Sequence, residues 1–121
     1  MQCTGSSMEP TIQNYDVLLT EHLSPILNQF CNGDIVIARS PADPHRIVCK
    51  RIVGTAGEKI QIKEDFSLSR YVTVPRGHVW LEGDNKSDST DSRTYGPVPQ
   101  ALLLGRAFCR IWPPQAFQIF P

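Results

Sequence analysis

The chain consists largely of short runs in which apolar and polar residues alternate. Alternation with a period of two indicates β-strands, because successive side chains of a strand point to opposite faces. Ten prolines and eight glycines punctuate these runs, as turns between strands require. We expect strands at residues 15–21, 34–39, 46–53, 59–63, 71–74, 78–82 and 106–112.

Helical periodicity is scarce, and the two best candidates for short helices are residues 23–30 and 100–104. The pattern therefore predicts a mainly β fold, with an antiparallel sheet and few short helices. The chain has 121 residues, of which 40% are hydrophobic. This length suits one modest core, so we expect residues 1–121 to form a single domain.

Charge and cysteine spacing exclude some functions. Twelve basic and twelve acidic residues give a net charge of zero without a basic cluster, which argues against nucleic-acid binding. Four scattered cysteines with no Cys-x-x-Cys pair argue against a zinc site, and no metal or cofactor is implied. An even count allows one or two disulfides, although buried thiols are the commoner state of scattered cysteines.

Ser7 is the first candidate for chemistry, in a polar segment that begins with Gly5 and reaches Pro10. A serine hydroxyl is a poor nucleophile until a base removes its proton. Gly5 leaves room for a substrate carbonyl, so the backbone N–H of Ser7 is a candidate oxyanion donor. Considered alone, the segment is also typical of an ordinary polar turn.

Lys50 is the candidate base. In a strand over residues 46–53 it lies on the same face as Val48 and Ile52. A lysine accepts a proton only when its amine is neutral, and lowering its pKa from about 10.4 to roughly 7–8 costs on the order of 4 kcal/mol. Burial beside apolar groups supplies such a change. A solvated basic pair with Arg51 is the simpler interpretation of this segment by itself.

A third segment, residues 83–93, reads Gly-Asp-Asn-Lys-Ser-Asp-Ser-Thr-Asp-Ser-Arg and follows the alternating run 78–82. Its composition alone is typical of a surface loop. In order after Ser-Met-Glu-Pro-Thr at 7–11 and Lys-Arg-Ile-Val-Gly at 50–54, however, it resembles the type I signal peptidase family. Residues 33–44 and 77–85 resemble in particular the mitochondrial inner membrane proteases of that family. The likeness covers nearly the whole chain.

The resemblance implies a role for each matching residue. Ser7 is similar to the nucleophile of the family and Lys50 to its general base. Gly5 stands where bacterial members often carry a serine that adds an oxyanion donor, so only the N–H of Ser7 clearly fills that role. The matching supporting residues are Asp84 and Asn85 in the loop, Ser89 as the hydroxyl that orients the lysine, and the ion pair Asp91 and Arg93.

The resemblance also implies a serine endopeptidase that removes hydrophobic sorting or leader peptides from proteins directed to the mitochondrial intermembrane space. It would be membrane-associated, at the inner membrane, and would work beside a second, related subunit. Members usually carry an N-terminal membrane segment, whereas six residues precede Ser7, so we expect the anchor to be missing. Met8 and the apolar residues 116–120 are candidate lipid contacts, although core packing is the better expectation.

Other interpretations stay open at this point. The chain is also compatible with a bacterial-type signal peptidase I, or with a non-catalytic binding subunit of a peptidase complex. A LexA-like self-cleaving domain is disfavoured, because no DNA-binding pair of helices is evident. A triad of Ser7, His78 and Asp84 is conceivable, since triads are defined in space. We expect the other histidines, His22 and His45, to be exposed.

Overall fold

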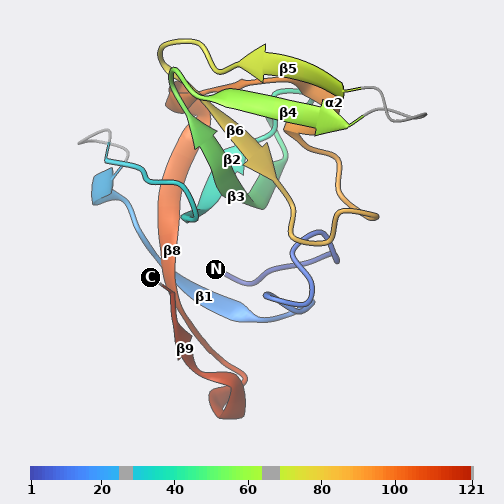
Figure 1. Cartoon of the computed structure of the whole chain (residues 1–121). Helices are drawn as coiled ribbons and strands as arrows, with labels where there is room; N and C mark the ends of the chain where they lie inside the picture. Colours follow the sequence, from blue (N-terminus) through green and yellow to red (C-terminus); the bar gives the residue numbers. More distant parts are fainter. Residues whose placement is uncertain (25–28, 64–68, 121) are drawn as a thin grey trace.

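The computed structural model describes residues 1–24, 29–63 and 69–120, which fold mainly into antiparallel β-sheet (Figure 1). The main sheet has the strand order β1-β8-β2-β3-β6-β7, and β9 pairs with β8. Its strands are β1 (Val17–Glu21), β2 (Ile35–Arg39), β3 (Ile47–Thr55), β6 (His78–Glu82), β7 (Val98–Pro99), β8 (Leu103–Trp112) and β9 (Gln118–Ile119). The predicted fold class is confirmed.

A second, two-stranded sheet consists of β4 (Lys59–Lys63) and β5 (Ser69–Thr73), which lie across one end of the main sheet (Figure 1). The helical segments that lie wholly within the described residues are α2 (Ser92–Tyr95) and the 3₁₀ turns η2 (Gln100–Leu102) and η3 (Pro114–Ala116). Within the described ranges, no helix has the length and apolar character needed to cross a membrane.

Strand β6 is buried on both faces. The alternation of residues 78–82 predicts one buried face, yet Val79, Trp80 and Leu81 are all buried. The reason is the second sheet, whose Ile60 packs with Val74 around Trp80, while Val79 and Leu81 pack into the main core. A strand between two apolar layers buries consecutive side chains, which a single-face pattern does not anticipate.

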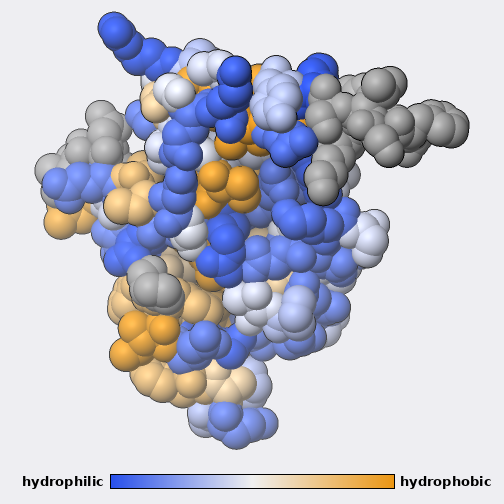
Figure 2. All heavy atoms as spheres, viewed as in Figure 1, coloured by the Kyte–Doolittle hydropathy of each residue, from blue (hydrophilic) through white to orange (hydrophobic). Residues whose placement is uncertain are grey.

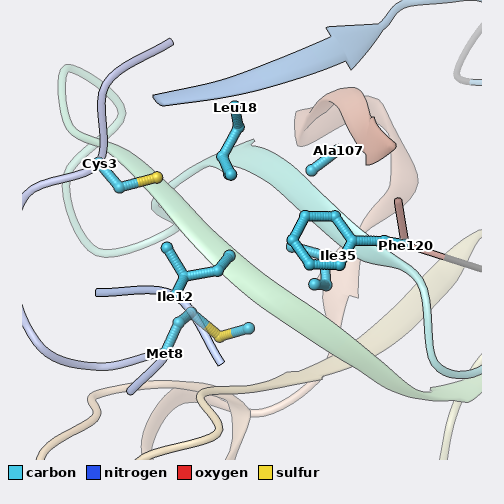
Figure 3. Packing of buried hydrophobic residues seen from close by; sticks show 7 residues of the cluster. All are labelled: Cys3, Met8, Ile12, Leu18, Ile35, Ala107 and Phe120. Atoms are coloured by element: carbon cyan, nitrogen blue, oxygen red, sulfur yellow. The ribbon is translucent and has the colours of Figure 1, made fainter. Parts of the chain in front are cut away.

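The N-terminal segment is packed onto the main sheet by a cluster of buried apolar side chains. The members of this cluster, here called the N-terminal cluster, are Cys3, Met8, Ile12, Leu18, Ile35, Ala107 and Phe120 (Figure 3). Strands β1, β2 and β8 each contribute one residue, and three come from the segment around Ser7. The expected core packing of Met8 is confirmed, and the cluster fixes the position of the segment that carries Ser7.

The apolar C-terminal residues divide between the core and the surface. Phe120 is buried in the N-terminal cluster, as expected, but Phe117 and Ile119 are exposed. Exposed apolar residues also lie on β1 and β8, where Leu19, Ile111 and Trp112 are the examples. Figure 2 shows apolar side chains gathered over this end of the sheet, in the lower part of the view.

The predicted strands are all present, with bounds that differ by a few residues. The predicted short helix at residues 100–104 is confirmed only for its first three residues. Only the single turn η2 forms, and β8 begins at Leu103, because Leu103 is buried in the main core and pairs with Ala38 of β2. The other predicted helix, residues 23–30, includes residues 25–28, which lie outside the described residues.

Replacing Leu18 with alanine tests the N-terminal cluster. Leu18 has no exposed surface, so we expect Leu18→Ala to lower the free energy of unfolding by about 2–5 kcal/mol through lost apolar contacts and the cavity left behind. The neighbouring Leu19 is 41% exposed, and Leu19→Ala is the matched control, with an expected loss below about 1 kcal/mol. Denaturant unfolding of both variants measures the difference, and equal losses would contradict this packing.

Candidate active site

A cavity of about 620 Å³ lies where the N-terminal segment, β3 and the loop 83–93 meet. Ser7, Lys50 and Ser89 all line it, together with Gly5 and Tyr95. Three segments far apart in the sequence thus contribute their polar side chains to one concave surface.

Lys50 lies on β3 and is only 4% exposed. Its Nζ donates a hydrogen bond to Ser89 Oγ at 3.0 Å. None of the ion pairs formed by the described residues includes Lys50. Burial lowers the pKa of Lys50 below its ordinary value, and the nearby negative charge of Asp91 only partly opposes this effect. The site therefore favours the neutral amine more than water does.

Asp91 anchors the hydrogen bonds of the loop. It is fully buried, and its carboxylate accepts a 2.7 Å bond from Ser89 Oγ and a 2.9 Å bond from the N–H of Gly83. Arg93 donates to it through the backbone N–H at 3.1 Å and through Nε and Nη2, each at 3.0 Å. Burial acts to raise the pKa of Asp91, but these hydrogen bonds outweigh burial, and the pKa lies below its ordinary value.

A directed chain of hydrogen bonds follows from this arrangement. Because Asp91 has a lowered pKa and its carboxylate accepts a hydrogen bond from the Ser89 hydroxyl, the Ser89 oxygen presents a lone pair to Lys50. The carboxylate charge is compensated mainly by Arg93 and not by the lysine. Lys50 is thus oriented by a hydroxyl without being paired to an anion.

The loop also holds the Ser7 segment. The N–H of Asn85 donates to the Ser7 carbonyl at 2.7 Å, and Asn85 Nδ2 donates to the Ser6 carbonyl at 3.1 Å. The Ser6 hydroxyl in turn donates to the Asp88 carboxylate. In the part of the chain that the structure describes, no group accepts from the Ser7 N–H or bonds its Oγ. Both groups of this half-buried residue are therefore available at the cavity.

Two residues that sequence reasoning left out of the site have clear places in it. Arg51 donates two hydrogen bonds to Asp84, of 2.9 and 2.8 Å, and so connects β3 to the start of the loop. Gly83 lies so close to the backbone of Ser7 and to Ser89 that a Cβ would be 2.6 Å from the Ser7 oxygen and would overlap Ser89 Oγ. Two sequence features could have pointed to these residues: Arg51 is a second basic residue next to Lys50, and Gly83 is a glycine directly after a strand.

The triad of Ser7, His78 and Asp84 is not assembled. His78 begins β6, whereas Gly83, which contacts Ser7, follows the last residue of that strand. At about 3.3 Å per residue, the two ends of β6 are roughly 13 Å apart. His78 Nδ1 contacts the Arg76 carbonyl, and His78 does not line the cavity. The expected exposure of the other two histidines, His22 and His45, is confirmed.

Metal ligands are not grouped in the described parts of the chain, where no set of three or more His, Cys, Asp or Glu side chains is arranged around a common point.

Comparison with known proteins places the chain in a family. The model of the family described as signal peptidase, peptidase S26, matches residues 1–68 and 65–112. The chain belongs to the signal peptidase S26 family. This finding confirms the resemblance that was drawn from the three motifs.

Relatives with curated names support the same assignment. The chain is 52% identical over 116 residues to the mitochondrial inner membrane protease subunit 1 of Xenopus tropicalis, covering 95% of this chain and 70% of the relative. It is 53% identical to the protein of that name from Homo sapiens over 93% of this chain and 69% of the relative. It is also 34% identical to the mitochondrial inner membrane protease subunit 2 of Saccharomyces cerevisiae, over 93% of this chain and 67% of the relative.

A solved structure shares the fold. A crystal structure of a signal peptidase I from Enterococcus faecalis V583 superimposes with a TM-score of 0.56 at 24% identity, over 64% of this chain and 96% of that chain. The S26 family member described here therefore has the sheet architecture of a signal peptidase.

The close approach of Gly83 to the Ser7 segment predicts that Gly83→Ala is damaging. The added Cβ displaces backbone and the Ser89 hydroxyl together, so we expect the free energy of unfolding to fall by about 1–3 kcal/mol more than in a glycine control. Gly57→Ala is that control, because its Cβ meets nothing within 4 Å and only its positive φ is strained, at about 1–2 kcal/mol. Denaturant unfolding compares them, and equal losses would show that Ser7 is not held against Gly83.

Proposed function

We propose that the chain is a serine endopeptidase in which Ser7 is the nucleophile and Lys50 the general base. One observation carries the proposal: a buried lysine amine with a lowered pKa lines the same cavity as a serine hydroxyl that has no hydrogen-bond partner among the described residues. A lysine in that state is a competent base, and a serine hydroxyl that such a base deprotonates is a competent nucleophile. Membership of a peptidase family agrees with this chemistry.

Each proton has a place in the reaction. Neutral Lys50 takes the proton of Ser7 Oγ, which attacks the carbonyl carbon of the scissile bond. The N–H of Ser7 stabilises the oxyanion. Lys50 then gives its proton to the leaving amine, and afterwards removes a proton from the water that hydrolyses the acyl-enzyme. The open space at Gly5 accommodates the carbonyl.

The loop residues act by positioning. Ser89 holds the lysine amine through the 3.0 Å bond and is itself oriented by Asp91. Arg93 neutralises Asp91, so that the lysine is not drawn into a salt bridge that would keep it protonated. Asp84 holds β3 to the loop through Arg51, and Asn85 holds the Ser7 segment to the loop.

The substrates we propose are the hydrophobic sorting or leader peptides of proteins directed to the mitochondrial intermembrane space. The relatives named mitochondrial inner membrane protease support a site at that membrane, and we place the catalytic cavity on its intermembrane-space side. The relatives named subunit 1 and subunit 2 support a second, related subunit as partner. Exposed apolar residues on β1, β8 and β9 suit membrane association.

Lys50→Arg tests the base. A guanidinium stays protonated in proteins, so we expect this change to lower the rate of cleavage of a leader-bearing peptide in detergent by about 10²–10⁴-fold. Lys86→Arg is the matched control, since the Lys86 side chain is 63% exposed and its ion pair among the described residues is with Glu82, and its rate should stay unchanged. Near-normal cleavage by Lys50→Arg would contradict the role of Lys50 as the general base. Absence of cleavage by the unmodified chain, equal to that of Ser7→Ala, would indicate a binding subunit instead.

The pH dependence of cleavage identifies the base. Because burial lowers the pKa of Lys50, the reactive neutral amine becomes populated at a pH below 10.5, the ordinary value for lysine. Activity should therefore rise with pH through that lowered pKa and be lost as the amine is protonated on the acid side. The measurement is the pH profile of kcat/KM. A profile that changes on His78→Ala would point to the histidine and against Lys50.

A further inference from the structure

Two cysteines meet on the wall of the cavity. Cys3 and Cys49 both line it, and Cys49 packs against the N-terminal cluster that contains Cys3. The two thiols are close enough for each to change the pKa of the other. Figure 3 shows the sulfur of Cys3 directed at the neighbouring strand β3, which carries Cys49. Both are thiols in this structure.

We propose that Cys3 and Cys49 form a reversible disulfide that ties the Ser7 segment to β3. Formation of this disulfide requires only that Cys3 and Cys49 lie next to each other. Its importance for cleavage rests on the proposed function, because Lys50 directly follows Cys49 and Ser7 lies four residues after Cys3. A covalent bond between the two cysteines restricts how far the proposed nucleophile and base can separate.

The two thiols differ in a way that suits disulfide exchange. The neighbouring Cys49 side chain lowers the pKa of Cys3 and favours its thiolate, whereas the neighbouring Cys3 and burial raise the pKa of Cys49. Thiolates are the attacking species in exchange. Cys3 is accordingly the attacking group, and Cys49 is the thiol that resolves the intermediate.

The oxidant is a disulfide of the glutathione or dithiol-oxidoreductase class. The Cys3 thiolate attacks one of its sulfurs, forming a mixed disulfide and releasing the first thiolate. Cys49 then loses its proton and attacks the Cys3 sulfur, which releases the second thiol. Two protein thiols and one disulfide become one protein disulfide and two thiols. The cavity gives a small oxidant a route to both sulfurs.

The other cysteines are suitable controls. Cys31 is exposed and Cys109 is buried, and neither lines the cavity. Incubating the Cys31→Ser variant with oxidised glutathione should remove two of its three thiols. Digestion without reduction, followed by mass spectrometry, should recover the peptide of Cys3 joined to that of Cys49. The melting temperature should rise on the order of 10 °C, since a cross-link across many residues restricts the unfolded chain.

The Cys31→Ser/Cys49→Ala variant should show no such rise, because the partner of Cys3 is absent. Retention of all three thiols in Cys31→Ser, or a link that involves Cys109, would overturn the proposal. Ser7→Ala in the Cys31→Ser background should form the same disulfide. Since the readouts are thiol counts, peptide masses and melting temperature, they stay decisive even if Ser7 and Lys50 prove not to be catalytic.

Discussion

The buried carboxylate of Asp91 is the constraint on which the arrangement of the site depends. A fully desolvated anion is tolerated only when its oxygens are satisfied, and here Gly83, Ser89 and Arg93 satisfy them. By meeting this requirement the chain brings the two ends of the loop 83–93 together. Ser89 is thereby placed within hydrogen-bond distance of Lys50, and Gly83 lies against the backbone of Ser7.

The same arrangement explains how a lysine can be buried without an anionic partner. Burial disfavours the charged amine, and a neighbouring carboxylate would normally restore the charge. In this chain the carboxylate is already paired with Arg93, and a hydroxyl stands between it and the amine. Desolvation is therefore the largest influence on the pKa of Lys50. Lys50 and Asp91 are therefore close together and yet do not form an ion pair with each other.

The segment that carries Ser7 has little regular secondary structure, so tertiary contacts must hold it. On one side its apolar residues pack in the N-terminal cluster. On another, Arg110 of β8 donates to the Thr11 carbonyl at 2.7 Å and to Asp16 at 3.2 Å. Asn85 holds it from the loop. The contact of Cys3 with Cys49 adds a further connection, which the proposed disulfide would make covalent.

The sequence by itself predicted the strands, the antiparallel class and the residues proposed for the active site. Period-two alternation is a local signal, and the three motifs are short contiguous segments. Three features depended on the tertiary structure. They are the burial of β6 on both faces, the early end of the predicted helix at residues 100–104 where β8 begins, and the contacts of Arg51 and Gly83. These features arise where segments distant in sequence come into contact, and the chemistry of a residue's neighbours in space is not contained in its neighbours along the chain.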